Sequence, residues 1–139
     1  MSGPVAKRLN LFLARIEAGL PENSFDRVYS ISVIEHIPPE EISSLMQEIR
    51  RILRPGGMAV MTIDLFLDLH PFTEERRNQW GTNVDVGSLV EASGLSLTKG
   101  DPDELLGFRS FDPQRVRGAL GEYLIGAYPV CSQALVLSK

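Results

Sequence analysis

The chain has 139 residues, of which 43% are hydrophobic and 23% are charged, and its formal net charge is −4. This composition is typical of a folded globular domain and excludes a disordered chain. A chain of this length forms one domain that buries roughly two-thirds of the surface exposed on unfolding. The acidic balance, with no run of Lys or Arg, predicts that nucleic acid is not a partner.

Cysteine usage and hydropathy indicate the compartment. The single cysteine, Cys131, excludes an internal disulfide and favours a reducing environment. Arg15 and Glu17 interrupt the short apolar stretch near the N-terminus before it reaches signal-peptide length. The sequence contains no stretch near the roughly 20 apolar residues that span a bilayer. We therefore expect a cytoplasmic protein without a membrane partner.

The elements are taken in chain order. Residues 5–18 fit a helix as well as a strand, and the pattern does not separate the two. Residues 28–34 are apolar apart from Ser30 and Ser32, which predicts a strand covered on both faces. Residues 39–53 then repeat apolar side chains at helical spacing, and this predicts one amphipathic helix.

A tight turn, a second strand and two further pairs of a helix and a strand follow. Pro55, Gly56 and Gly57 predict the turn, and residues 58–63 predict another buried strand. Asp85 is a good N-cap for a helix that ends at Gly94, and residues 95–98 alternate like a strand. A further helix is predicted from Asp112 and Pro113 to Leu124, and a last strand over residues 133–138. The order β-α-β-α-β-α-β predicts an α/β fold.

Titratable side chains follow the first two predicted strands. Glu35 and His36 come after the first strand and Asp64 after the second. In an open parallel sheet the ligand crevice lies at these carboxyl ends. Imidazole takes up a proton near neutral pH, so His36 is a candidate base. The alternative is structural: an acid and a solvated imidazole that only begin the following helix.

Other candidates are interpreted as structural. Asp64, Asp68 and His70 together could ligate a metal, but nothing in the sequence fixes their geometry, so we predict no metal. We expect Asp64 to face the crevice and the other two to line a surface loop. Trp80 and residues 66–72 are either packing or the wall of an acceptor pocket, and packing is the commoner outcome.

Three blocks of sequence carry a family resemblance. They are Asn23-Ser24-Phe25-Asp26-Arg27-Val28, Val33-Ile34-Glu35-His36-Ile37 and Glu48-Ile49-Arg50-Arg51-Ile52-Leu53-Arg54-Pro55-Gly56-Gly57. In this order and spacing they resemble the fourth strand, the following helix and the fifth strand of class I S-adenosylmethionine-dependent methyltransferases. The resemblance covers roughly residues 10–139 and is weakest after Leu65. It implies a partial Rossmann-like methyltransferase sheet, mostly parallel, with an antiparallel last strand and flanking helices.

The resemblance also implies site residues. S-adenosylmethionine would be the cofactor, with Ser30, Ile31 and Ser32 at its methionine end and Ile16 near its adenine. Glu35, His36 and Asp64 would be the catalytic residues, with His36 or Glu35 as the base. Certain quinone-pathway O-methyltransferases hold a divalent metal with Glu-x-x-Glu-His at this place. Ser32 replaces the first of those glutamates here, so the resemblance does not imply a metal.

Departures from the family limit what is expected. The sequence has no counterpart of the family's first strand, of its glycine-rich loop or of the acidic residue that binds the ribose. We therefore expect a methyltransferase-like protein that acts on an unknown small acceptor and is incomplete as this chain alone. The alternative is a non-catalytic, methyltransferase-derived binding or regulatory domain, so whether the chain is an enzyme stays open.

The domain organisation follows from the same comparison. We expect a single truncated domain over residues 1–139, with an N-terminal segment (1–24), a βαβαβ core (25–99), an insert (100–133) and a last strand (134–139). Without the family's first strand, residues 28–34 become an exposed hydrophobic edge that invites pairing. Residues 10–16, a second copy of the chain or a complementing polypeptide would cover this edge.

Overall fold

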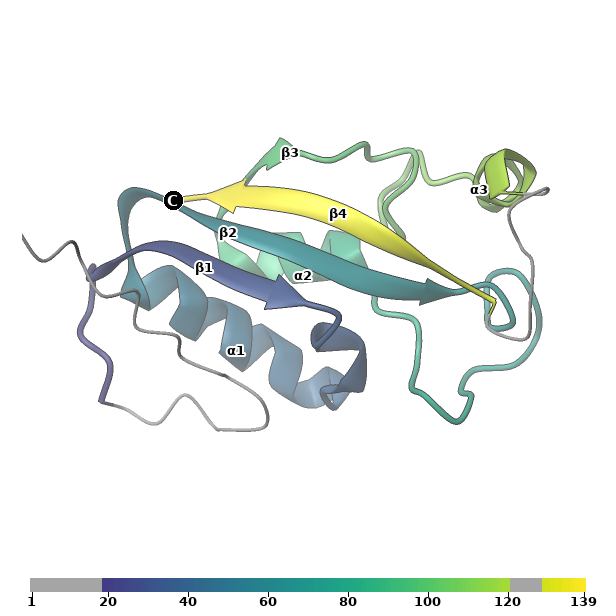
Figure 1. Ribbon diagram of the computed structural model, residues 1–139, viewed down its shortest axis with the longest axis horizontal. Helices are drawn as coiled ribbons and strands as arrows, with labels where there is room; N and C mark the ends of the chain where they lie inside the picture. The colour runs from purple at the N-terminus through teal and green to yellow at the C-terminus, as the bar shows by residue number, and fades with distance from the viewer. Residues whose placement is uncertain (1–18, 121–128) are drawn as a thin grey trace, which may run out of the picture.

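The computed structural model describes residues 19–120 and 129–139. The described residues follow the predicted β-α-β-α-β-α-β order, with one additional 3-10 turn, η1 (Figure 1). The elements are β1 (Phe25–Ile31), η1 (Ile34–His36), α1 (Pro39–Ile52), β2 (Leu53–Phe66), α2 (Val86–Ser93), β3 (Ser96–Lys99), α3 (Pro113–Leu120) and β4 (Val130–Ser138).

The strands form one sheet in the order β1-β2-β4-β3. β1 and β2 are parallel, and β4 lies antiparallel between β2 and β3. β2 and β3 therefore run in the same direction, and only the last strand is reversed. This arrangement confirms the predicted α/β sheet with an antiparallel last strand.

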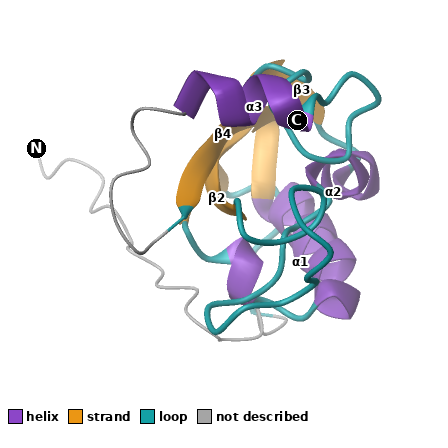
Figure 2. Cartoon of the chain, turned by 90° about the vertical axis from the view of Figure 1, so that its right-hand side faces the viewer, coloured by secondary structure: helices purple, strands orange, loops and turns teal. Residues whose placement is uncertain are grey.

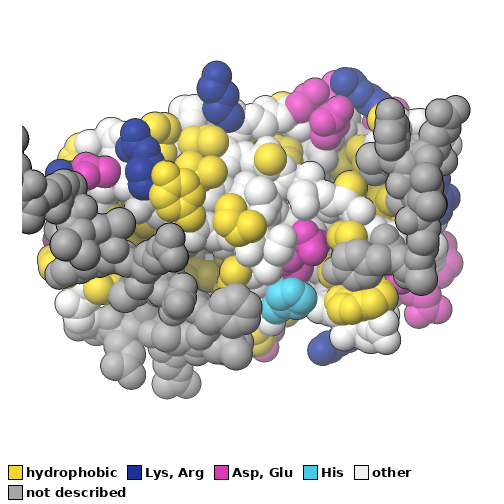
Figure 3. Space-filling view, viewed as in Figure 1, with side chains coloured by type: hydrophobic (Ala, Val, Ile, Leu, Met, Phe, Trp, Pro, Cys, Tyr) yellow, Lys and Arg dark blue, Asp and Glu magenta, His cyan; other side chains and the backbone are white. Residues whose placement is uncertain are grey.

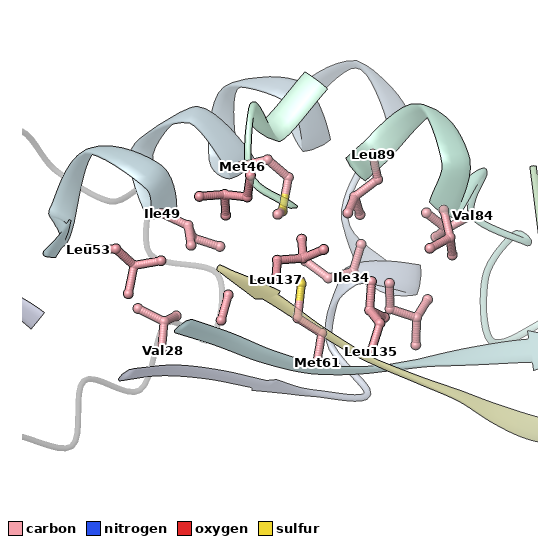
Figure 4. Close-up of a cluster of buried hydrophobic side chains, with 14 of the residues drawn as sticks. Val28, Ile34, Met46, Ile49, Leu53, Met61, Val84, Leu89, Leu135 and Leu137 are labelled. Atoms are coloured by element: carbon pink, nitrogen blue, oxygen red, sulfur yellow. The ribbon is translucent and has the colours of Figure 1, made fainter. Parts of the chain in front are cut away.

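Helices α1 and α2 cover one face of the sheet, behind the strands in Figure 1. Their apolar side chains meet those of the strands in a single main cluster (Figure 4). The residues at its centre are exposed by 2% or less: Ile34, Met46, Ile49, Ile52, Leu53, Ala59, Met61, Ile63, Val86, Leu89, Leu105, Leu135 and Leu137. The helical spacing predicted over residues 39–53 therefore marks the buried face of α1.

The predicted Pro-Gly-Gly turn is contained within β2. Phe25 pairs with Leu53 and Arg27 pairs with Met58, so two steps along β1 match five along β2. Gly56 occupies the left-handed region with φ of 80°. A Cβ on Gly57 would lie 2.8 Å from the carbonyl oxygen of Arg54, so only glycine fits there. The turn thus leads directly from α1 into the long part of β2.

Several predicted boundaries shift. β1 spans Phe25–Ile31 rather than residues 28–34, because the chain turns into η1 before Ile34. β2 extends to Phe66 and β4 begins at Val130, beyond the apolar runs that predicted them. The backbone ladder between these two strands continues through Asp64 and Ser132, because backbone pairing does not depend on side-chain polarity. The predicted C-terminal part of the third helix, to Leu124, lies outside the described residues.

The prediction that β1 is covered on both faces is wrong. Val28 is the one buried side chain of this strand, whereas Tyr29 is 65% and Ile31 57% exposed. The reason is that α1 and α2 lie on the same side of the sheet. The other face shows hydrophobic side chains in the open in the space-filling view (Figure 3).

Residues 100–120 of the predicted insert lie at the end of the sheet where β2 ends and β4 begins, with α3 at that end (Figures 1 and 2). Val116 of α3 joins a second apolar cluster with Leu65 and Leu67. Phe72 and Phe111 add an edge-to-face ring contact with centroids 6.5 Å apart. This small cluster fixes the loops around the carboxyl end of β2.

Candidate functional site

The candidate site lies at the carboxyl ends of β1 and β2. After β1, Ser32 adopts a positive φ of 50° and redirects the chain into η1. Ile34 is 1% exposed and anchors this turn in the main core. Glu35 consequently lies within the protein, whereas His36 is at the surface. One short turn thus gives two adjacent titratable residues opposite environments.

Asp64 accepts hydrogen bonds from two hydroxyl groups, one just after β1 and one in β4. Ser32 Oγ donates a hydrogen bond to Asp64 Oδ1 at 2.9 Å, and Ser132 Oγ donates to the same oxygen at 3.4 Å. The Ser32 amide also donates to the Thr62 carbonyl oxygen at 3.0 Å. The carboxylate therefore has a fixed place and is half-buried, on the opposite face of β2 from the buried Ile63.

Glu35 is the most unusual side chain of the site. It is 2% exposed, and neither carboxyl oxygen has a hydrogen-bond partner in the described part of the chain. Burial raises the pKa of this carboxyl, and the negative charge of Asp64 raises it further. The backbone amides of Glu35 and Asp64, which lie near the carboxyl but outside hydrogen-bond geometry, and the charge of His36 each lower this pKa, by less than burial raises it.

A glycine allows the covering segment to approach Glu35. A Cβ on Gly81 would lie 2.6 Å from the carbonyl oxygen of Glu35. A larger residue would therefore push this segment away from the turn. Buried polar groups nearly always have a partner, so the unpartnered carboxyl calls for an explanation in terms of a bound group or a catalytic role.

His36 is oriented by a backbone group. Its Nδ1 lies 2.8 Å from the carbonyl oxygen of Trp80. A carbonyl oxygen only accepts hydrogen bonds, so Nδ1 carries the proton in the neutral imidazole and Nε2 keeps its lone pair. The ring is exposed, which leaves Nε2 able to receive a proton.

Three of the four predicted cofactor residues lie within the described part of the chain. Ser30 and Ile31 pair with Met61 and Thr62 of β2, with Ser30 half-buried and Ile31 exposed on the uncovered face. Ile16 lies outside the described residues. The structure brings Ser32, Glu35 and Asp64 together, and Ser30 and Ile31 lie just before them along β1.

The remaining candidates have structural surroundings. Asp68 accepts hydrogen bonds from Asn78 Nδ2 at 3.1 and 3.4 Å, and His70 is an exposed loop residue. Over residues 19–120 and 129–139, no three His, Cys, Asp or Glu side chains are placed to hold a metal ion. Phe66, Leu67 and Leu69 are buried and Phe72 packs on Phe111, so this stretch is packing rather than an open pocket wall.

Two polar residues of the site were missed from the sequence. Ser132 lies beside Asp64 because β4 begins three residues before the predicted strand. Its signal is weak, since a polar residue ahead of an apolar run usually marks a loop. Asn83 accepts from the Phe66 amide at 2.7 Å and donates to the Phe66 carbonyl at 2.8 Å. Nothing in the sequence shows that this side chain continues the ladder at the end of β2.

Cys131 also lies near Asp64, but its thiol is unreactive. Burial raises the pKa of its thiol to about 11, with the charges of Asp64 and Glu104 contributing. The thiol is therefore protonated at neutral pH and a poor nucleophile.

Comparisons with known proteins agree with this geometry. A family model described as "Methyltransferase domain" matches residues 3–61. The sterol 24-C-methyltransferase ERG6B of Gibberella zeae is 31% identical over 91 residues, which are 62% of this chain and 23% of that protein. The sterol 24-C-methyltransferase erg6 of Aspergillus fumigatus is 35% identical over 91 residues, 62% of this chain and 24% of that protein.

Solved structures share the fold. An S-adenosylmethionine-dependent methyltransferase from Mesorhizobium loti superposes with a TM-score of 0.56 at 18% identity, covering 86% of this chain and 64% of that one. The cyclase SpnF superposes with a TM-score of 0.54 at 18% identity, covering 86% of this chain and 52% of that one. Likeness at this identity shows the fold, and the pair of proteins indicates that the fold alone does not fix the reaction.

The sequence blocks, the match to a methyltransferase-domain model over residues 3–61 and the sheet order agree with one another. The chain is similar to class I S-adenosylmethionine-dependent methyltransferases in sequence and shares their fold. It spans about a quarter of the length of the curated relatives that it matches. Among the described residues, no helix is both long and apolar enough to cross a membrane.

Proposed function

We propose that the chain transfers a methyl group from S-adenosylmethionine to a small acceptor, at a site that a second copy or a complementing polypeptide completes. The observation that supports this most strongly is the set of His36, Glu35 and Asp64 at the carboxyl ends of two parallel strands. His36 has a free Nε2 lone pair, Glu35 is buried without a partner and Asp64 is fixed by hydroxyl groups.

The described residues fit the reactive end of this cofactor. Its sulfonium group is positively charged, and the two carboxyl groups of the site are compatible with positive charge near the reacting atoms. The backbone of Ser30, Ile31 and Ser32 would border the methionine end. When bound, the cofactor supplies an electrophilic methyl group.

The protein's own residues would position the acceptor and move its proton. His36 Nε2 would take the proton that the acceptor loses as it becomes a nucleophile. Glu35 is the second candidate base, because burial raises its pKa and makes its ionised form a stronger base. Asp64 would hold charge at the reacting centre with the help of Ser32 and Ser132.

The alternative function is a non-catalytic binding or regulatory domain. It is favoured by Tyr29 and Ile31, which expose apolar surface next to the edge of β1. Such a surface suits contact with another polypeptide, whether or not the chain is catalytic.

A transfer assay separates the two functions. The purified chain is incubated with methyl-tritiated S-adenosylmethionine and fractionated small-molecule extract, and tritium in the extract products is counted. A methyltransferase transfers label, and His36→Gln lowers the rate about 100-fold or more, the usual size of general-base catalysis. Transfer that is unchanged in both His36→Gln and Glu35→Gln would contradict the assigned roles.

The oligomer part of the proposal has its own measurement. Sedimentation velocity at micromolar concentration reports whether two copies associate. A single monomeric species would exclude completion by a second copy and leave only the complementing polypeptide.

A further inference from the structure

Neither carboxyl group of the site forms an ion pair with a Lys or Arg in the described part of the chain. The ion pairs of that part are formed elsewhere: Arg51 with Glu48, Arg54 with Asp26, and Arg115 with three acidic residues near α3. Asp64 is held by hydroxyl groups alone, and Glu35 by no side chain. The one neighbouring positive charge that acts on Glu35 in the described part of the chain is that of His36, which follows it directly in the sequence.

We propose that Glu35 and Asp64 bind the positively charged nitrogen of the methyl acceptor, so that the substrate class is a small aliphatic amine. This inference rests on the proposed function, which it deepens by naming the acceptor. A protonated amine offers N–H donors, which the unpartnered Glu35 oxygens need, and charge-assisted hydrogen bonds of this kind are the strong ones.

The number of carboxyl groups favours an organic cation over a metal ion. A hard divalent ion takes six or more oxygen ligands, commonly several from carboxylates. The described site offers two carboxyl groups, and Ser32 and Ser132 already direct their hydroxyl hydrogens to Asp64. An ammonium group needs only two or three acceptors, which the two carboxyl groups supply.

The reaction balances with the groups in place. The acceptor enters as an ammonium ion, and His36 Nε2 takes one of its protons to give the neutral amine. The nitrogen lone pair then forms a bond to the donated methyl carbon. The bond between that carbon and sulfur breaks, and its electron pair stays on sulfur, which becomes a neutral thioether. The nitrogen is positive again, and Glu35 and Asp64 stabilise its charge.

A matched pair of probes tests the inference on the full chain. N,N-dimethylethanolamine is protonated at neutral pH, and 3-methylbutan-1-ol is its neutral isostere of nearly the same shape. Each is titrated into ¹⁵N-labelled protein, and the affinity is taken from backbone amide shifts. We expect the wild type to bind the amine about tenfold or more tightly than the alcohol, the size of a hydrogen bond to a charged group. Equal affinities would overturn the inference.

Variants locate the binding. Glu35→Gln keeps the shape of the side chain and removes its charge, and we expect it to lose most of the preference for the amine. Glu91→Gln makes the same change at an exposed position of α2 and is the control, for which the preference should be unchanged. Loss of the preference in the control but not in Glu35→Gln would overturn the inference. If a variant fails to fold, the affinities of the wild type for the amine and the alcohol still test the inference.

A third titration shows whether the carboxyl groups bind the amine or the sulfonium group of the cofactor. S-adenosylmethionine is titrated into the wild type and Glu35→Gln. If the substitution weakens the cofactor but leaves the amine preference intact, the positive group is the cofactor's sulfonium, and the inference fails while the proposed function survives. If the wild type binds the amine selectively but not the cofactor, the amine site stands and the proposed function fails.

Discussion

The two faces of the sheet differ in almost every property. On the face toward α1 and α2, Met61 and Leu137 are completely buried in the main core. On the other face, Tyr29 and Ile31 are more than half exposed, and Asp64 lies at the carboxyl end of β2. The first face therefore supplies the stability of the described domain, and the second is available for binding.

The sheet of this chain differs from a usual α/β sheet in how its two faces are covered. Strands of an α/β sheet are usually covered by helices on both faces. In this chain the helices that pack on the main core, α1 and α2, lie on one side of the sheet. No helix among the described residues covers the other face of β1 and β2. A surface of this kind favours completion by another segment or chain.

Two neighbouring positions of β4 test the contrast most strongly. Leu137→Ala removes a fully buried side chain and should lower the free energy of unfolding by about 2–5 kcal/mol. Val136→Ala, on the opposite face, should lower it by about 1 kcal/mol or less, because that side chain is only half-buried. Urea denaturation measures both. Equal losses would show that the second face is covered too.

The pH dependence of Glu35 sharpens the comparison at the site. Because its folded pKa is raised by burial, the unfolded chain releases this proton first as pH rises. The free energy of unfolding of the wild type should therefore fall as pH rises from about 4.3, the ordinary glutamate value, through the raised folded value. Glu35→Gln lacks this loss, so its stability relative to the wild type should grow over that range. Parallel stability curves from urea titrations would contradict the buried, unpartnered carboxyl.

The N-cap of α2 allows a smaller test of the helices that cover the sheet. Asp85 Oδ1 accepts a hydrogen bond from the Ser88 amide at 2.8 Å. Asp85→Ala should lower the free energy of unfolding by about 1 kcal/mol, whereas Asp85→Asn, which keeps an accepting oxygen, should lower it less. Thermal unfolding compares the two variants, and a larger loss for Asn than for Ala would rule out capping as the cause.

The smallest effect on stability is expected on the uncovered face. Ile31→Thr should change the stability of the monomer by about 0.5 kcal/mol or less, because the side chain is 57% exposed. If a second copy packs there, the same substitution weakens self-association in sedimentation velocity. A large loss of stability at concentrations where the chain is monomeric would show that Ile31 is buried in the folded monomer.

The covered face could be predicted from the sequence and the uncovered face could not. The spacing of Met46, Ile49 and Ile52 fixed the buried side of α1, because helical periodicity reports burial directly. A run of apolar residues such as 28–34 does not reveal whether one or both faces are covered, so the exposure of Ile31 was missed.

The candidate site could be placed but not detailed. Glu35, His36 and Asp64 follow strands in the sequence, and parallel pairing of β1 and β2 brings strand ends together. The burial of Glu35 depends on Gly81, which is distant in sequence, and the contact of Ser132 depends on the register of β4. Such contacts follow from tertiary structure, which local patterns do not encode.

The most direct test of the central claim is isothermal titration of the chain with S-adenosylmethionine, at protein concentrations where sedimentation shows self-association. We predict saturable binding tighter than about 100 μM, which corresponds to a binding free energy of about −5.5 kcal/mol. An absence of binding at millimolar ligand would contradict the claim that this chain carries a methyl-donor site, and would support the non-catalytic alternative.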